Sequence, residues 1–263
     1  MPIVSVLMGV YYRRTNLFFL KRSLQSILAQ SISDLEVLIC DDGSTDEARE
    51  YLTNMATQDP RIRLIRKGHL FSLPEKLNAC LAQATAPLIA RMDDDDRCAP
   101  ERFQCQIQFL ETHPEIDFVG CCADLERNGA LVGTRMLPEY PDVPDFFMTQ
   151  PYLHPALMFR KQVLDAVNGY SEEKRCILCE DYDLLLRLYR AGYRGANLQE
   201  RLLTYTLPDT AKGNRKMRHR WNETVTRWIR FKELGVLPRA LPFVVKPLVV
   251  GLIPGKILAK IRK

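Results

Sequence analysis

The sequence predicts an α/β fold in which a mostly parallel central sheet is flanked by helices. Short apolar runs rich in β-branched residues alternate with longer runs whose apolar residues recur at helical spacing. The connections between these runs are short. Strand–helix alternation of this kind is typical of βαβ units, in which successive strands are parallel and helices cover the sheet.

The same patterns place the elements in order. We expect strands at 3–10, 36–40, 62–65, 88–92 and 117–121. We expect helices at 17–30, from a cap at Thr45 or Asp46 onward, and at 73–84, 100–113 and 161–167. Prolines at 138, 141 and 144 predict loops over 127–150. A further helix begins near Glu180, with Arg187 and Arg190 expected on its outer face.

The net charge of +5 combines two oppositely charged parts of the chain. Residues 1–211 carry 23 Lys and Arg against 30 Asp and Glu, a net charge of −7. Residues 212–263 carry 14 Lys and Arg against two Glu, a net charge of +12. This division predicts a main domain at 1–211 and a basic helical segment at 212–263 that meets an anionic surface.

Cysteine usage and the N-terminus indicate a cytoplasmic protein. Several of the eight cysteines lie inside apolar runs, which is typical of reduced, buried thiols. The run from Met1 to Val6 is typical of a first strand, because it has neither the basic start nor the cleavage site of an export signal.

Two aspartate clusters, Asp41-Asp42 and Asp93 to Asp96, follow predicted strands. Ligands of parallel sheets bind outside the carboxyl ends of the strands, so both clusters are expected at one crevice. Hard cations such as Mg²⁺ and Mn²⁺ prefer carboxylate oxygens and often share their shell with substrate phosphates. The sequence therefore favours a metal–diphosphate site, and a solvated acidic turn that caps the next helix is the alternative.

Several segments of the chain form an ordered set of motifs: Val4 to Tyr11, Ser26 to Gln30, Cys40 to Asp46, Ala90 to Asp96 with Pro100 to Phe103, Asn168 to Tyr170, and Glu180 to Asp183. In sequence and in order, this set resembles family 2 inverting glycosyltransferases. The resemblance covers about residues 3–205 and includes the D-x-D and ED motifs of that family. It implies a GT-A fold, in which a Rossmann-like sheet binds the nucleotide, and a likeness to enzymes of bacterial exopolysaccharide and surface polysaccharide synthesis.

The resemblance also implies roles for individual residues. Asp181 matches the general base, and Glu180 beside it is an orienting or acceptor contact. The implied nucleotide contacts are Val10, Tyr11, Asp41, Asp42, Asn78, Asp93 and Asp94, and the implied ligands of Mn²⁺ or Mg²⁺ are Asp95 and Asp93. His154, next to an apolar run, is a candidate contact of the diphosphate or the acceptor, or else a structural histidine.

These residues predict a metal-dependent inverting glycosyltransferase. It would move a sugar from a nucleotide-diphospho-sugar, by analogy a UDP-sugar, to a hydroxyl of a lipid-linked or polysaccharide acceptor. The metal would stabilise the leaving diphosphate, and Asp181 would take the acceptor proton. The alternatives are a non-catalytic nucleotide-sugar-binding or interaction protein on the same fold, and a nucleotidyltransferase. The segment from Gly9 to Asn16 lacks the Gly-rich basic loop that is usual in nucleotidyltransferases.

The C-terminal segment interleaves basic residues with aromatic and aliphatic ones. Its apolar run over 240–253 is interrupted by prolines and by Lys246. A helix that spans a membrane needs about 20 apolar residues, so this segment is predicted to lie on an anionic membrane surface, at the inner face of the cell membrane. A helical pair packed on the domain is the alternative, and no motif supports binding of nucleic acid.

Overall fold

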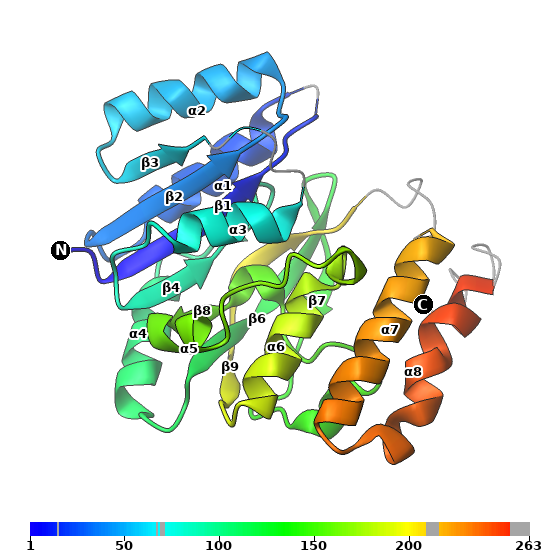
Figure 1. Cartoon of the computed structure of the whole chain (residues 1–263). Helices are drawn as coiled ribbons and strands as arrows, with labels where there is room; N and C mark the ends of the chain where they lie inside the picture. The colour runs from blue at the N-terminus through cyan, green and yellow to red at the C-terminus, as the bar shows by residue number, and fades with distance from the viewer. Residues whose placement is uncertain (15, 67, 69–71, 209–215, 253–263) are drawn as a thin grey trace.

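The computed structural model describes residues 1–14, 16–66, 68, 72–208 and 216–252. In these ranges one nine-stranded sheet runs through the molecule in the order β3-β2-β1-β4-β8-β6-β9-β5, and β7 pairs with β6 (Figure 1). Helices lie on both faces of the sheet. The predicted α/β class is therefore confirmed.

The N-terminal half of the sheet is parallel, as predicted. β1 (Val4–Val10) pairs with β2 (Leu35–Asp41) and β4 (Leu88–Arg91), and β2 pairs with β3 (Ile62–Ile65). The connecting helices are α1 (Phe18–Leu28), α2 (Asp46–Gln58) and α3 (Leu73–Leu81). Because β1 is buried on both faces, its sequence is a continuous apolar run without alternation.

The C-terminal half mixes parallel and antiparallel pairs. Its elements are β5 (Arg97–Cys98), α4 (Arg102–Thr112), β6 (Phe118–Arg127), β7 (Ala130–Arg135), β8 (Met158–Arg160), α5 (Lys161–Ala166), α6 (Glu180–Arg190) and β9 (Gly195–Thr206). β6 is parallel to β9 and antiparallel to β7 and β8. This half also contains α6, whose first turn carries the predicted site residues Glu180 and Asp181.

The strand expected at 117–121 is present as the first part of β6, which extends to Arg127. The expectation of loops over 127–150 is wrong, because this segment contains β7. Asn128 and Gly129 join the two strands with φ values of 52° and 81°. Positive φ at both central residues is the backbone of a two-residue hairpin turn, for which Asn-Gly is the preferred sequence. The local signal for β7 was therefore present in the sequence.

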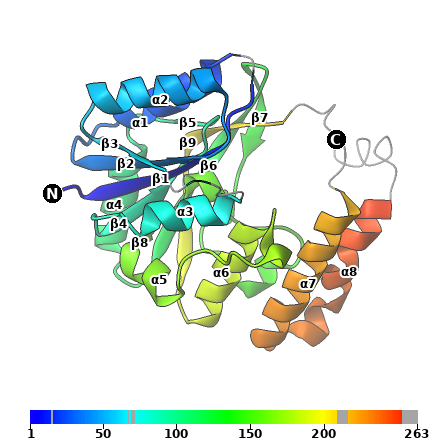
Figure 2. The same cartoon turned by 45° about the horizontal axis from the view of Figure 1, so that its top comes forward.

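Each face of the sheet carries its own hydrophobic cluster. One cluster joins the sheet to α1, α2 and α4 through residues such as Leu24, Leu52 and Phe103. The other joins it to α3, α5 and α6 through residues such as Leu77 and Leu185. Figure 2 shows the sheet between α1 and α2 on one side and α3, α5 and α6 on the other. All eight cysteines are free and seven are buried, as their apolar surroundings predict.

The C-terminal segment forms a helical hairpin that packs against α6 (Figure 1). It consists of α7 (Met217–Glu233) and α8 (Leu237–Leu252). Phe231 of α7 is fully buried, and its ring centroid lies 5.2 Å from that of Phe147, which also stacks on Phe243. The predicted C-terminal helices are present, while 212–215 and 253–263 lie outside the described residues. Among the described helices, none combines the length and the hydropathy needed to cross a bilayer.

Candidate active site

The carboxyl ends of β2, β1 and β4 are adjacent, because these strands are neighbours in the sheet. Asp41 ends β2 and is in register with Val10, which ends β1. The run from Asp93 to Asp96 follows β4 almost directly. Both acidic clusters therefore lie at one edge of the sheet, as the predicted topology requires.

An open cavity of about 400 Å³ adjoins the first cluster. Its lining comes from the end of β2, from α2 and from the segment after β3: Asp41, Asp42, Gly43, Asp46, Arg49, Glu50, Thr53, Arg66 and Gly68. The lining combines carboxylates, which can accept hydrogen bonds from hydroxyl groups, with the guanidinium groups of Arg49 and Arg66, which attract anions. Arg49 and Arg66 were not predicted, since a lone arginine in a helix or after a strand carries no specific signal.

Lys76 holds the ends of β1 and β2 together below this cavity. Its side chain is buried, and its ammonium donates hydrogen bonds to the backbone carbonyls of Val10 (2.6 Å) and Asp42 (3.0 Å). Burial lowers the pKa of this amine, and the charge of Asp41 opposes that shift. Lys76 was not predicted, because a lysine in an amphipathic helix is usually solvated.

Tyr11 offers a stacking surface next to the same strand ends. Its side chain is 61% exposed, and the Lys76 ammonium lies 5.2 Å from the ring centroid. The ring lies close to Gly43, where φ is +87° and an added Cβ would meet the ring at 2.9 Å. Any other residue at this position would be strained by the positive φ and would displace the ring. An exposed aromatic ring so supported can stack on a planar group such as a nucleobase.

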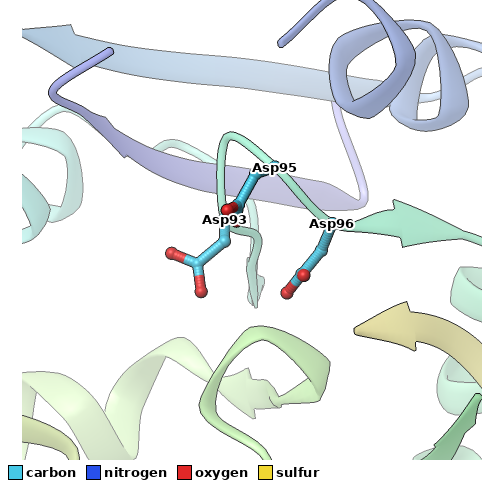
Figure 3. A group of neighbouring side chains, drawn as sticks. All are labelled: Asp93, Asp95 and Asp96. Carbon is cyan, nitrogen blue, oxygen red and sulfur yellow. The ribbon is translucent and has the colours of Figure 1, made fainter. Parts of the chain in front are cut away.

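Asp93, Asp95 and Asp96 place carboxylate oxygens within 4.8 Å of one another. Figure 3 shows the three side chains on the turn that joins β4 to β5. Asp96 is fully buried, and its Oδ1 accepts a hydrogen bond from the Thr206 N–H at 2.7 Å. Its Oδ2 has no hydrogen-bond partner among the described residues. A buried carboxylate oxygen without a partner is costly unless a cation completes its environment, so this set fits Mg²⁺ or Mn²⁺. Asp96 was not among the predicted ligands, although it belongs to the predicted run.

Burial and mutual repulsion disfavour ionisation in this run. Burial, followed by the charges of Asp95 and Asp93, raises the pKa of Asp94 to about 7, although the Tyr11 N–H donates to it. Burial, followed by the charge of Asp93, raises the pKa of Asp95 to about 6. The pKa of Asp96 is raised well above its ordinary value for the same reasons. A divalent cation among these oxygens would relieve the repulsion.

Three arginines face this cluster, and none was predicted. Nη1 of Arg91 lies 2.5 Å from Oδ1 of Asp93, and Nη2 of Arg14 lies 2.5 Å from Oδ2 of Asp95. Arg22 donates to the Asp95 carbonyl at 3.3 Å. Guanidinium groups bind phosphate oxygens as readily as carboxylates, so these side chains suit a site for an anionic ligand.

Glu180 and Asp181 form the first turn of α6. Oδ2 of Asp181 accepts from Nε2 of Gln150 at 3.0 Å, and Oδ1 accepts from the Tyr182 N–H at 2.7 Å. Burial, followed by the charge of Asp181, raises the pKa of Glu180 to about 7, while Arg91 opposes the shift. One carboxylate of the pair is thus oriented by two fixed donors. Gln150 was not predicted.

His154 is buried, and its Nε2 shares a hydrogen bond with the Tyr170 hydroxyl at 2.8 Å. Burial, followed by the charge of Arg91, lowers the pKa of His154 well below its ordinary value. His154 is therefore neutral at physiological pH and bonded within the protein. Contact between His154 and a substrate stays a prediction.

Arg91 and Tyr170 interact electrostatically with both groups of carboxylates. The charges of Asp181 and Asp93 both act on the Tyr170 hydroxyl, and Arg91 acts on Glu180 as well as Asp93. Segments far apart in the sequence are thus brought into one neighbourhood. The amide of Asn78, an expected nucleotide contact, instead exchanges two 2.9 Å hydrogen bonds with the Tyr170 backbone. A contact between Asn78 and a nucleotide stays a prediction.

Comparison with known proteins identifies similar chains. The model of the glycosyl transferase family 2 domain matches residues 5–164. EpsE of Bacillus subtilis is 32% identical over all of this chain and 94% of its own length. The amylovoran biosynthesis glycosyltransferase AmsE of Erwinia amylovora is 31% identical over 70% of this chain and 69% of its own length.

Solved structures share the fold at low identity. Staphylococcus aureus TarS in complex with UDP-GlcNAc matches 94% of this chain and 73% of its own with a TM-score of 0.72 at 16% identity. The mannosyltransferase PcManGT of Pyrobaculum calidifontis, in complex with GDP-Man and Mn²⁺, matches 98% of this chain and 79% of its own with a TM-score of 0.63 at 16% identity.

Proposed function

Because the chain belongs to glycosyl transferase family 2, we propose that it transfers a sugar from a nucleotide-diphospho-sugar to an acceptor hydroxyl and inverts the anomeric carbon. The observation that carries this proposal is that Arg91 and Tyr170 interact electrostatically with both the Asp93–Asp96 turn and the Glu180-Asp181 pair. The Asp93–Asp96 turn suits a diphosphate, and the Glu180-Asp181 pair suits an acceptor hydroxyl.

The donor is expected to be a UDP-sugar. The cavity at Asp41 and Asp42 would hold the nucleoside, and Tyr11 would stack on its base. The UDP-GlcNAc complex of TarS supports this assignment, while the GDP-Man complex of PcManGT makes GDP-sugars the first alternative. Val10 and Asp94 would contribute to the nucleotide site through their places beside Lys76 and Tyr11.

Asp93, Asp95 and Asp96 would hold the divalent cation. When bound, Mn²⁺ or Mg²⁺ stabilises the negative charge that develops on the diphosphate leaving group. Arg14 pairs with the Asp95 carboxylate and Arg22 donates to the Asp95 backbone carbonyl, so both side chains would contact the phosphates. Arg91 fixes the orientation of Asp93 from the protein side.

Asp181 would act as the general base. It would accept the proton of the acceptor hydroxyl while that oxygen forms its bond to the anomeric carbon, and the bond from that carbon to the phosphate oxygen breaks. Gln150 and the Tyr182 N–H hold its two oxygens, which fixes the carboxylate for this transfer. Glu180 would orient the acceptor. A single displacement inverts the anomeric configuration.

We further propose that the acceptor is lipid-linked or a surface glycan and that the enzyme works at an anionic membrane surface. Among the similar proteins are AmsE and an Escherichia coli enzyme named for a diphosphoundecaprenol acceptor. Exposed apolar residues form one stripe on each helix of the hairpin: Met217, Trp221 and Trp228 on α7, and Leu241, Val245 and Val249 on α8. Arg218 and Lys232 are exposed beside the first stripe. Aromatic, aliphatic and basic side chains together favour the interface of an anionic leaflet.

The donor proposal is tested with a thermal-shift panel of UDP- and GDP-sugars, with Mn²⁺ or with EDTA. We expect the largest stabilisation with one UDP-sugar and Mn²⁺, and a much smaller effect in EDTA. A parallel assay measures the UDP that is released from the donor. Release of UDP without metal would favour another mechanism, and binding of the donor without any release would favour the non-catalytic alternative. The configuration of the product's anomeric carbon, read by NMR, tests inversion.

The membrane proposal is tested by co-sedimentation of the full chain with vesicles. We expect binding to vesicles of mixed phosphatidylcholine and phosphatidylglycerol, little binding to phosphatidylcholine alone, and weaker binding at high salt. Replacing Trp221 and Trp228 together by serine should abolish pelleting. Equal behaviour of the wild type on both kinds of vesicle would rule out an anionic surface as the partner.

A further inference from the structure

The backbone just before the catalytic pair adopts an unfavourable conformation. Leu178 has a φ of +65°, a left-handed value that a leucine rarely adopts, and its side chain is 47% exposed. Cys179 follows as the N-terminal cap of α6, and Glu180 and Asp181 come next. Strained residues persist only where the surrounding structure holds them, and they concentrate at functional sites. The groups that hold this segment therefore determine where the two carboxylates point.

Helix α7 supplies such groups through side chains that contact the segment before α6. Asn222 donates to the Lys174 carbonyl at 3.1 Å. The hydroxyl of Thr226 is buried, donates to the Arg175 carbonyl at 3.4 Å and lies 3.5 Å from Sγ of Cys179. These contacts cross about 50 residues of sequence, so only the packing of the hairpin brings them together.

A buried ion cluster joins α7 to α6 itself. Asp183, two residues after Asp181, is fully buried and is surrounded by three arginines. Arg230 of α7 donates through Nε at 2.9 Å, Arg187 donates at 2.9 Å, and Arg175 donates at 3.3 Å. Burial alone would raise the pKa of Asp183. The hydrogen bond and the charge of Arg230 outweigh burial and hold this pKa below its ordinary value. Arg187, expected on the outer face of the helix, points into this cluster instead.

A second connection from α7 reaches the donor that orients Asp181. Arg227 is buried, and its Nη1 donates to the Phe147 carbonyl at 2.8 Å. Its guanidinium carbon also lies 4.6 Å from the centroid of the Tyr182 ring. Phe147 lies three residues before Gln150, whose amide bonds to Asp181. Both the helix that carries Asp181 and the loop that orients its side chain are thus fastened to α7.

We infer that α7 is a positioning element of the active site, and that Arg230, through Asp183, holds Glu180 and Asp181 in their working orientation. The inference rests on the proposed function, because it assigns the C-terminal hairpin a part in the chemistry beyond membrane contact. Arg230 touches no reacting atom: its Nε bonds to Asp183 and its Nη1 bonds to Glu233 at 2.7 Å, and of these two partners only Asp183 lies on α6. Misplacement of a catalytic group by about 1 Å can cost on the order of 100-fold in rate, so such a role is measurable.

The test compares Arg230→Met, Arg230→Lys and the matched control Arg190→Met in the full-length protein. Arg190 lies on α6 and forms a more exposed ion pair with Glu233 of α7, which also pairs with Arg230. Loss of Arg190 therefore breaks an α6–α7 contact and leaves the Arg230–Asp183 pair in place. We expect Arg230→Met to lower kcat by about 10- to 100-fold with an unchanged donor Kd in calorimetry with Mn²⁺. Arg230→Lys should recover part of kcat, and Arg190→Met should retain it.

A double-mutant cycle with Asp181→Asn separates positioning from general loosening of the structure. If Arg230 acts by placing Asp181, adding Arg230→Met to Asp181→Asn should lower kcat little further, whereas an independent structural defect would multiply the two losses. Full activity of folded Arg230→Met, or multiplied losses, would overturn the inference. Should Arg230→Met fail to fold, Thr226→Val removes one buried hydroxyl contact and is judged by the same cycle. Absence of transfer by the wild type with every donor would instead refute the proposed function.

Discussion

Replacing Asp95 by asparagine should stabilise the metal-free protein at alkaline pH while weakening its response to Mn²⁺. Burial, followed by the charge of Asp93, raises the pKa of Asp95 to about 6 in the folded protein, against about 4 in an unfolded chain. A carboxyl whose pKa is raised by folding contributes stability that is present below its unfolded pKa and is lost as the pH rises through the folded pKa. Above about pH 6 the ionised Asp95 therefore opposes folding.

The magnitude follows from this shift. Two pKa units correspond to about 3 kcal/mol at pH 8. The Asp95 side chain is 26% exposed and its pairing with Arg14 would be lost, so solvent screening and the broken pair reduce the expected gain. We expect Asp95→Asn to gain about 1 to 2 kcal/mol at pH 8 in EDTA, and nothing at pH 4. For a chain of this size the gain corresponds to a Tm increase of roughly 2 to 8 °C.

Urea denaturation at pH 8 and pH 4, each with EDTA or with Mn²⁺, measures both parts of the prediction. Wild-type protein should gain stability from saturating Mn²⁺ at pH 8, and Asp95→Asn should gain much less. Asp165→Asn is the matched control, because Asp165 is a half-exposed aspartate paired with Lys161 far from the cluster. If Asp95→Asn proved less stable than wild type at pH 8 in EDTA, or gained as much from Mn²⁺, the reasoning about the cluster would be refuted.

Three further predictions concern other parts of the molecule. Asp181→Asn should lower kcat by about 10²- to 10⁴-fold, the usual contribution of a general base, with an unchanged donor Kd in calorimetry; a loss below tenfold would remove Asp181 as the base. Lys76→Met should raise the donor Kd about tenfold, because the Val10 and Asp42 carbonyls lose their shared hydrogen-bond donor. An unchanged Kd would mean that the ends of β1 and β2 keep their positions without Lys76. Phe231→Ala should cost about 3 to 5 kcal/mol of stability in urea, because a fully buried ring is deleted; a cost below about 1 kcal/mol would show that the hairpin docks loosely.

Local patterns predicted the strands of the parallel half and the edge of the sheet at which the two acidic clusters lie. The strands β1, β2 and β4 are mostly apolar without alternation because they are buried on both faces. The aspartates at the ends of β2 and β4 mark their carboxyl ends. Thr45 was a correct helix cap, since capping depends on neighbouring backbone groups alone. The Asn128-Gly129 signal for a hairpin was equally local. It was missed because the prolines that follow it predicted loops for the whole segment.

The residues that complete the site carried no local signal. Lys76, Gln150 and Arg230 are polar residues in ordinary surroundings, and each acquires its role through a partner far away in the sequence. Arg187 was expected to face solvent because helical spacing places it opposite the leucines. Its burial depends on Asp183 and on the hairpin that covers that side of α6.

By itself, then, the amino-acid order determined the α/β class, the family resemblance and the chemical character of the acidic clusters, because periodicity, caps and residue type act over a few neighbouring positions. The tertiary structure alone decided which charges meet and which of them resist ionisation. Asp183 and Arg230 are separated by 47 residues and pair only because α7 packs on α6. Asp94 and Glu180 titrate near neutrality because the fold removes them from water, and removal from water is a property of packing that no short stretch of sequence encodes.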